Sequence, residues 1–272
     1  MAKFRIGHTG ITWGFDSAGA KQAIKDTAEL GYLSYETFGS VVDEFRKAEP
    51  GGLGAVLRSH GLLLSAVYCP TIFYDPVDAG PHVEEILLWA KLGRDLGASA
   101  VVLEGGRRKE KPYTMYRGMG EVFSEIGRRV KDLGLVTAIH PHTGTLIETR
   151  AEIDAILGAV DPEVVGFAPD TGQIAKGGGD AVATLRDHKS RIKHVHLKDY
   201  AGGRETVHGG YAPIGGGVID MAGIFAVLEE VDFSGWVNVE LDGPPAPPLT
   251  SRDVAAMALG YLKGLLRDRA AW

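Results

Sequence analysis

Short β-rich runs alternate with longer amphipathic segments along the whole chain. Runs of five or six residues, rich in Val, Ile, Leu and aromatic side chains, predict eight strands. They are Phe4–His8, Leu33–Thr37, Leu63–Tyr68, Ala100–Glu104, Val136–His140, Val164–Pro169, Ile192–Leu197 and Trp236–Leu241. Between them, apolar residues recur at steps of three and four, which predicts helices such as Ala18–Leu30, Val83–Leu96, Met115–Leu133, Ala151–Leu157 and Met221–Val231.

The junctions between these elements carry ordinary helix-end signals. A glycine stands between a predicted helix and the next strand at Gly31, Gly61, Gly97 and Gly134, the place of a helix-terminating glycine. Thr149 and Glu152 have the spacing of a capping box, which predicts a helix start there.

Strict alternation of strands and helices predicts a parallel sheet, and eight units permit closure into a (β/α)8 barrel. We therefore expect residues 1–272 to form a single barrel domain, because no linker or break in composition divides the chain. A doubly wound open sheet is the alternative, disfavoured because no strand is followed by a GxGxxG or GxxxxGK[ST] phosphate cradle. The glycine-rich segment Gly202–Gly217 is long enough to serve as a lid over an active site.

The composition and net charge of the chain disfavour several classes of protein. The chain is 44% hydrophobic and 24% charged, as in soluble globular proteins. Its single cysteine, Cys69, suits a reducing cytoplasm, and neither a signal peptide nor a run of about 20 apolar residues is apparent. The net charge of −6 disfavours a nucleic-acid partner. A cytoplasmic protein with no membrane or nucleic-acid partner is expected.

Titratable side chains gather at the predicted strand ends. The active site of a (β/α)8 barrel lies at the C-terminal ends of its strands. Seven ends carry Asp, Glu or His: His8, Glu36, Glu104, His140 with His142, Asp170, His194 with His196, and Glu240. Such a mixture of oxygen and imidazole ligands predicts a site for a divalent metal ion of the Mn²⁺, Co²⁺, Fe²⁺ or Zn²⁺ type rather than Ca²⁺.

Structural roles compete with this interpretation. Asp170 could cap the following helix, Glu240 could pair with Lys198, and Glu104 could neutralise the arginines of the next loop, Arg107 and Arg108. His194 is predicted to face the helix layer, opposite to His196.

The motifs around strands six and seven resemble a known superfamily. The runs Pro169-Asp170-Thr171-Gly172 and His194-Val195-His196-Leu197-Lys198-Asp199, with the later segment Ile214–Asp220, are similar to the xylose-isomerase-like sugar isomerase/epimerase superfamily. The run from Ile139 to Thr145 is similar to inosose dehydratases. The resemblance implies a barrel enzyme that acts on a small polyhydroxy ketone.

Carried over by position, the resemblance implies metal ligands at His140, Asp170, His196 and Glu240. His140 departs from the superfamily, in which Glu is usual at the first place. Gln173 departs as well, since His is common there, and this argues against a dinuclear endonuclease-type centre. Mn²⁺ is the expected metal, with Co²⁺, Fe²⁺, Zn²⁺ and Mg²⁺ as alternatives.

Isomerisation, epimerisation and dehydration of a hydroxy ketone share a first step, in which a base removes the proton next to the carbonyl and a metal stabilises the enediolate. A 3-epimerase needs a base on each face of the carbon, whereas a dehydratase needs one base and one acid. With His140 in place of a carboxylate, the site together with its metal is near neutral. This favours dehydration of a keto-inositol or keto-sugar.

The predicted catalytic residues are Glu104 as general base, His142 as acid or substrate contact, and Glu240. Predicted substrate contacts are His8, Trp13, Glu36 and Lys198.

Three other functions remain open: a sugar isomerase or 3-epimerase on the same scaffold, a non-catalytic sugar-binding or partner subunit, and an abasic-site endonuclease. The acidic pI of about 5.9 and Gln173 disfavour the endonuclease. Homo-oligomers through the outer helices are compatible with the sequence.

Overall fold

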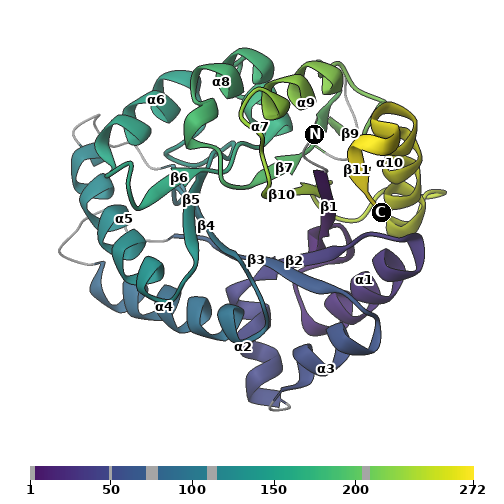
Figure 1. The fold of residues 1–272 in the computed structure, drawn as a ribbon, viewed down its shortest axis with the longest axis horizontal. Helices are drawn as coiled ribbons and strands as arrows, with labels where there is room; N and C mark the ends of the chain where they lie inside the picture. The colour runs from purple at the N-terminus through teal and green to yellow at the C-terminus, as the bar shows by residue number, and fades with distance from the viewer. Residues whose placement is uncertain (1–3, 49–50, 72–78, 109–114, 204–208) are drawn as a thin grey trace.

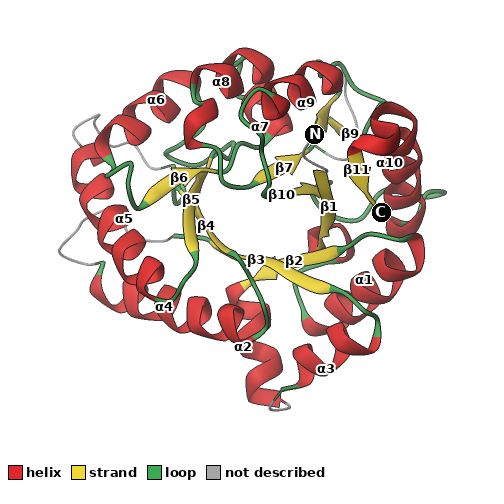
Figure 2. Ribbon diagram, in the orientation of Figure 1, coloured by secondary structure: helices red, strands yellow, loops and turns green. Residues whose placement is uncertain are grey.

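The strands form a ring that the helices surround (Figures 1 and 2). The computed structural model describes residues 4–48, 51–71, 79–108, 115–203 and 209–272. Within these residues, eight parallel strands build the ring. They are β1 (Phe4–Thr9), β2 (Ser34–Phe38), β3 (Leu63–Cys69), β4 (Ala100–Glu104), β5 (Val136–His140), β6 (Val165–Phe167), β7 (Val195–Leu197) and β10 (Trp236–Val239).

The sheet curls into the closed (β/α)8 barrel that the sequence predicts. The ladder runs β6-β5-β4-β3-β2-β1-β10-β7. Parallel bridges close the gap between β6 and β7, pairing Phe167 with Ile192 and Asp170 with His196. Because β6 and β7 meet through isolated bridges, both are shorter than predicted. The C-terminal β11 (Ala270–Ala271) pairs with the start of β1.

The helices form the outer layer. They are α1 (Ser17–Leu30), α2 (Gly39–Ala48), α3 (Gly52–Ser59), α4 (Gly80–Asp95), α5 (Met115–Asp132), α6 (Arg150–Ala159), α7 (Thr171–Lys176), α8 (Ala181–Asp187), α9 (Met221–Glu229) and α10 (Ser251–Leu266). The predicted capping box of Thr149 and Glu152 begins α6, with both reciprocal hydrogen bonds. Gly31 ends α1 at φ 101°, a left-handed conformation that glycine adopts without steric cost.

Two apolar layers hold the fold together. The larger packs the outward faces of the strands against the helices; Phe4 of β1, for example, contacts Phe225 of α9 at 5.0 Å between ring centroids. The smaller lies among inward-facing residues and is built largely from alanines: Ala66, Tyr68, Ala100, Val102, Ala138 and Ala168. Short side chains in this layer leave room for polar residues inside the barrel.

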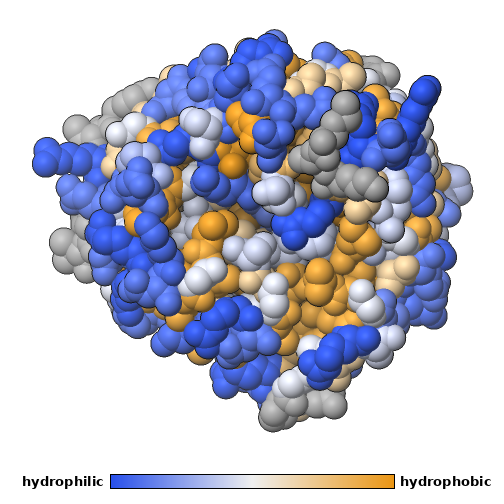
Figure 3. All heavy atoms as spheres, viewed as in Figure 1, coloured by the Kyte–Doolittle hydropathy of each residue, from blue (hydrophilic) through white to orange (hydrophobic). Residues whose placement is uncertain are grey.

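Hydrophilic residues dominate the periphery of the molecule in Figure 3, and apolar residues gather nearer the middle of that face. Within the described residues, no helix has the length and apolar character that crossing a membrane requires.

The predicted lid segment Gly202–Gly217 is described only in part, since residues 204–208 lie outside the described residues. Its described part contains β9 (Tyr211–Ala212), which pairs antiparallel with β8 (Asp199–Tyr200). This pairing brings Tyr211 next to the strand ends.

Candidate metal centre and active site

A cavity of about 750 Å³ opens at the C-terminal ends of the strands. The residues that line it follow or end the strands, as the barrel fold requires of an active site. They include Thr9, Glu36, Phe38, Tyr68, Glu104, Arg107, Arg108, His142, Thr143, His196, Glu240 and Asp242.

Three of the four predicted metal ligands come together beneath this cavity. One ligand atom each from His140, Asp170 and His196 lies within 4.8 Å of the other two, and all three side chains are buried. Neither ring nitrogen of His140 has a hydrogen-bond partner among the described residues. Asp170 Oδ2 is 3.9 Å from His140 Nε2, too far for a hydrogen bond. An unsatisfied buried imidazole is costly unless something binds it, so this geometry fits a metal ligand.

The fourth predicted ligand, Glu240, lies beside this group and is engaged by other residues. Its Oε2 is 2.8 Å from His196 Nδ1, and its Oε1 is 2.8 Å from Lys198 Nζ. The ammonium of Lys198 also contacts Asp170 Oδ2 at 2.8 Å and Asp242 Oδ1 at 2.7 Å. Lys198 is fully buried and absent from the cavity lining, so the described conformation places it among carboxylates rather than at a substrate.

Asp170 has a second function as the cap of α7. Its Oδ1 accepts a hydrogen bond of 2.8 Å from the backbone N–H of Gln173. The structural alternative considered for Asp170, a helix cap, is therefore present, and it leaves Oδ2 directed toward Lys198 and His140.

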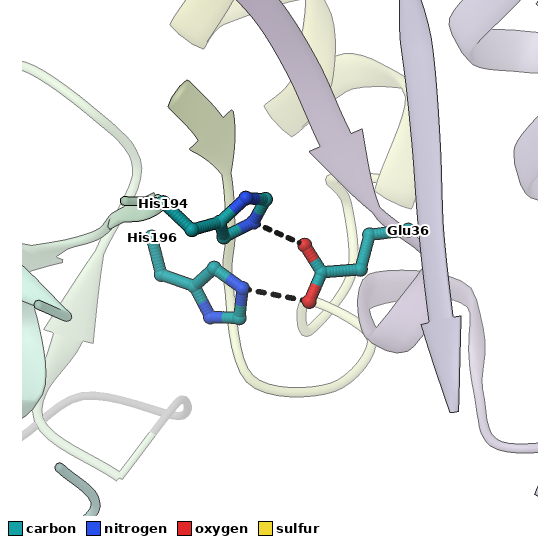
Figure 4. A group of neighbouring side chains, drawn as sticks. All are labelled: Glu36, His194 and His196. Carbon is teal, nitrogen blue, oxygen red and sulfur yellow. Dashed lines mark hydrogen bonds and ion pairs between the residues drawn. The ribbon is translucent and has the colours of Figure 1, made fainter. Parts of the chain in front are cut away.

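The prediction that His194 faces the helix layer is wrong. The side chain faces into the barrel, not the helix layer, because residues two apart on a strand share a face. Its Nε2 lies 2.7 Å from Glu36 Oε2, while His196 Nε2 lies 2.8 Å from Glu36 Oε1 (Figure 4). Asn238 of β10 donates to Glu36 as well. Glu36 is thus 1% exposed, with both oxygens occupied, and is no free substrate contact in this conformation.

Burial and neighbouring charges set the protonation of these groups. Burial and the nearby His196 hold the pKa of His140 well below its ordinary value, so its imidazole is neutral. Burial would also lower the pKa of His196, but the carboxylates of Glu36 and Glu240 raise it well above the ordinary value. Burial alone would raise the pKa of Glu36, yet His196 and His194 bring it to about 2.

Glu104 and His142 reach the cavity from neighbouring strands. Glu104 Oε2 accepts a hydrogen bond of 2.9 Å from the Tyr68 hydroxyl, which orients the carboxylate. Of the two arginines that Glu104 would neutralise in the alternative interpretation, Arg107 and Arg108, Arg108 pairs instead with Glu152 at 2.7 Å. His142 Nδ1 lies 2.8 Å from the carbonyl oxygen of Thr143 and must donate to it, which leaves Nε2 free for proton transfer.

Gln173 joins two loops above the site. Its Oε1 accepts from the backbone N–H of Thr143 at 3.0 Å and from the hydroxyl of Tyr211, and its Nε2 donates to Asp242 Oδ2 at 3.0 Å. The departure from histidine at this position thus has a structural consequence, because Gln173 Oε1 accepts three hydrogen bonds, from Thr143 N–H, the Thr143 hydroxyl and the Tyr211 hydroxyl, whereas the acceptor nitrogen of an imidazole has one lone pair.

His8 and Trp13 lie away from the cavity that they were predicted to line. His8 shares the outward face of β1 with Phe4 and Ile6, and packs edge-on against Trp13 and Tyr32. The Trp13 indole donates to Asp26 Oδ2 at 2.9 Å.

Aromatic residues that were not predicted to contact substrate line the cavity instead. Phe15, Phe38 and Tyr68 contact one another in series, with ring centroids 5.4 and 5.2 Å apart. The two-residue step from Glu240 could have revealed Asp242. No local signal reveals Tyr211, which a hairpin brings from a distant loop.

The fold is that of a xylose isomerase-like TIM barrel. The model of that family matches residues 24–263, and the chain belongs to it. It is 30% identical to an inosose dehydratase of Geobacillus kaustophilus, over 98% of this chain and 96% of the relative.

Two solved structures share the fold. The IOLI protein with a bound zinc atom has a TM-score of 0.78 and 18% identity, over 97% of this chain and 99% of that one. The probable 3-DHS dehydratase AsbF of Bacillus anthracis has a TM-score of 0.77 and 14% identity, over 96% and 98%.

Proposed function

We propose that this protein is a metal-dependent dehydratase that removes water from a small polyhydroxy ketone of the keto-inositol or keto-sugar class. The observation that carries the proposal is His140: a neutral imidazole, fully buried, with both nitrogens unpartnered among the described residues, next to Asp170 and His196. A neutral imidazole beside a carboxylate is the donor set that a divalent transition metal prefers.

His140, Asp170 and His196 would hold the metal, with Glu240 as the fourth ligand after its contacts with His196 and Lys198 rearrange. When bound, a divalent metal supplies Lewis-acid polarisation of a ketone oxygen and stabilises the negative charge that develops there. Mn²⁺ remains the predicted ion. The carboxylates of Asp170 and Glu240 would balance the two positive charges of the metal, and Lys198 offsets Asp242.

Glu104 is the proposed general base. Its carboxylate reaches the cavity, and the hydrogen bond from Tyr68 fixes its direction; among the described residues no ion pair engages it. In the proposed reaction, Glu104 takes the proton from the carbon next to the ketone. General-base catalysis by a positioned carboxylate contributes about 10²–10⁴-fold.

His142 is the proposed acid for the departing hydroxyl. Because Nδ1–H is bonded to the carbonyl of Thr143, Nε2 is the atom that can carry a proton into the cavity. In its protonated form His142 gives that proton to the β-hydroxyl, which leaves as water, and the electron pair of the broken C–H bond becomes the new C=C bond.

The lining of the cavity supports a polyol substrate. Glu104, His142, Thr143 and Asp242 offer hydrogen-bonding groups, while Phe38 and Tyr68 offer aromatic faces for ring C–H groups. The name of the inosose dehydratase relative supports 2-keto-myo-inositol as the first substrate to test.

The test is mass spectrometry after incubation of the Mn²⁺-supplemented protein with 2-keto-myo-inositol and a panel of ketohexoses. A product lighter by one water supports the dehydratase. A product of unchanged mass but altered retention would indicate the isomerase or 3-epimerase reaction instead. The absence of any product across the panel would contradict the proposed chemistry and favour a sugar-binding role.

A further inference from the structure

A chain of buried polar residues leads from His194 through Glu36 to the predicted ligand His196 (Figure 4). The two histidines come from the same segment before and within β7, and Glu36 comes from β2 on the other side of the barrel. All three side chains are about 1% exposed. A hydrogen-bonded network of side chains this deeply buried is geometrically constrained, because the low local dielectric strengthens its bonds and leaving a member unpaired is costly.

The positions of the protons in this network follow from Glu36, whose carboxylate can only accept hydrogen bonds. The two N–H bonds of the Asn238 amide are directed to Glu36 Oε2 and to Ser65 Oγ, the latter at 2.9 Å. Nε2 of His194 and Nε2 of His196 lie 2.7 and 2.8 Å from the two Glu36 oxygens, so each must carry the proton that it donates.

With Nε2–H committed to Glu36, His196 has only Nδ1 for another partner. Nδ1 points to the side of the ring where Glu240 Oε2 lies at 2.8 Å, next to Lys198. Glu240 is one of the predicted ligands, and Lys198 beside it also contacts the predicted ligand Asp170. We propose that Glu36 and His194 are positioning residues that fix the Nε2–H form of His196 and present its Nδ1 as the metal-ligating nitrogen.

This proposal rests on the metal site of the proposed function. It adds that Nδ1 of His196 binds the metal, and that Glu36 and His194 determine this choice of nitrogen. Carboxylate partners of this kind fix the tautomer and ring orientation of metal-bound histidines, and their loss weakens metal affinity about 10–100-fold. His194 acts one step further out, by donating to the second oxygen of Glu36.

The cluster of Glu36, His194 and His196 also brings possible ligand atoms within 4.8 Å of one another, but it is a poor metal site by itself. The Asn238 amide directs a donor N–H at Glu36, where a cation would be repelled. The backbone supports this placement, because a Cβ at Gly7 would lie 2.1 Å from Asn238 Oδ1. Only glycine at this position of β1 leaves room for the Asn238 side chain.

The test uses the full chain labelled with ¹⁵N-histidine and long-range ¹H–¹⁵N correlation spectra, recorded without metal and with Zn²⁺. His196→Gln assigns the signals. The expected result is a protonated Nε2 in both spectra and a Zn²⁺-dependent shift at Nδ1 of His196. Zinc coordination through Nε2 would overturn the inference. This measurement needs no substitution of Glu36, so it decides even if such variants fail to fold.

Zn²⁺ titration of variants gives the second readout. We expect Glu36→Gln and His194→Leu to bind Zn²⁺ about 10–100-fold more weakly than the wild type. His194→Gln, whose amide can replace the Nε2–H donor, should restore most of the affinity. Thr137→Val is the matched control, because Thr137 is buried on β5 and its hydroxyl has no hydrogen-bond partner in the part of the chain that the structure describes.

The outcomes separate this inference from the proposed function. Zn²⁺ binding that Glu36→Gln and His194→Leu leave unchanged in folded protein overturns the positioning role and keeps the metal site. Failure of the wild type to bind Zn²⁺ overturns the metal site and the positioning role together.

Discussion

Lys198 and Asp170 form an ion pair in which both side chains are fully buried, with 2.8 Å between Nζ and Oδ2. Glu240 and Asp242 contact the same ammonium. Burial alone would lower the pKa of Lys198, but these carboxylates, Asp170 foremost, raise it well above its ordinary value. A permanent cation of the protein therefore lies against the predicted ligand set and offsets part of its negative charge.

Replacement of this cation should destabilise the fold. Lys198→Met keeps the length of the side chain but leaves three carboxylates without their shared partner. Breaking a buried ion pair on one side typically costs about 3–5 kcal/mol, and we expect that loss in the free energy of unfolding measured by urea denaturation. Lys25→Met, on an exposed position of α1, is the control. An unfolding free energy equal to the wild type would show that Lys198 is not needed to balance these charges.

Asp170→Asn should separate metal binding from helix capping. Asparagine can still accept the hydrogen bond from the Gln173 N–H, so α7 should persist, whereas the lost charge should greatly weaken Mn²⁺ retention. Asp170→Ala should in addition lose about 1 kcal/mol of stability with the cap. Asp180→Asn, at the start of α8, changes a capping aspartate away from the site and should keep the metal. Full Mn²⁺ retention by Asp170→Asn would refute the ligand assignment.

Glu104→Gln should stop the chemistry and spare the metal. The amide can still accept from Tyr68 but cannot take up a proton, so kcat should fall by about 10²–10⁴. Steady-state kinetics and metal analysis on the same sample measure both effects, with the surface variant Glu121→Gln as control. Should Glu104→Gln keep wild-type kcat, another residue must be the base.

Because His8 is buried, we expect the free energy of unfolding to decrease in acid. Burial lowers its pKa to about 4, against an ordinary value of 6.5. In the unfolded chain His8 becomes protonated near pH 6.5, whereas in the folded protein it stays neutral until about pH 4. The free energy of unfolding therefore falls as the pH drops from about 6.5 to about 4. One pKa unit corresponds to about 1.4 kcal/mol, which gives a loss of about 3 kcal/mol.

His8→Asn, which keeps a donor near Nδ1, should flatten this pH dependence in urea denaturation at pH 7 and pH 4.5. His60→Asn, on an exposed histidine, should not. Equal slopes in wild type and His8→Asn would assign the acid sensitivity to other groups.

The sequence predicted the barrel well because its signals are local. Strand runs, helix-ending glycines and the capping box of Thr149 depend on residues within a few positions of one another, and the structure reproduces them. The alternation of side chains along a strand is equally local, but the prediction for His194 was wrong, because His194 and His196 are two residues apart and therefore share a face. The same alternation would also have placed His8 on the helix face, since Phe4, Ile6 and His8 alternate toward the same layer.

The partners of the site residues depend on pairing across the barrel and could not be predicted. Glu36 meets His194 and His196 only because β2 and β7 face each other across a narrow, alanine-lined interior. Likewise, the contact of Lys198 with Asp242 and that of Tyr211 with Gln173 join segments far apart in the chain. Strand-end chemistry therefore indicated which side chains converge, but not which atoms they use.

The most direct test of the central claim is the metal content of the protein after Mn²⁺ loading and removal of free ions, compared with His140→Phe. The variant keeps an aromatic ring against Tyr68 and removes both unpartnered nitrogens. We predict one Mn²⁺ per chain in the wild type and much less in folded His140→Phe. No retained metal in the wild type, or equal retention in both proteins, would contradict a metal centre built on His140.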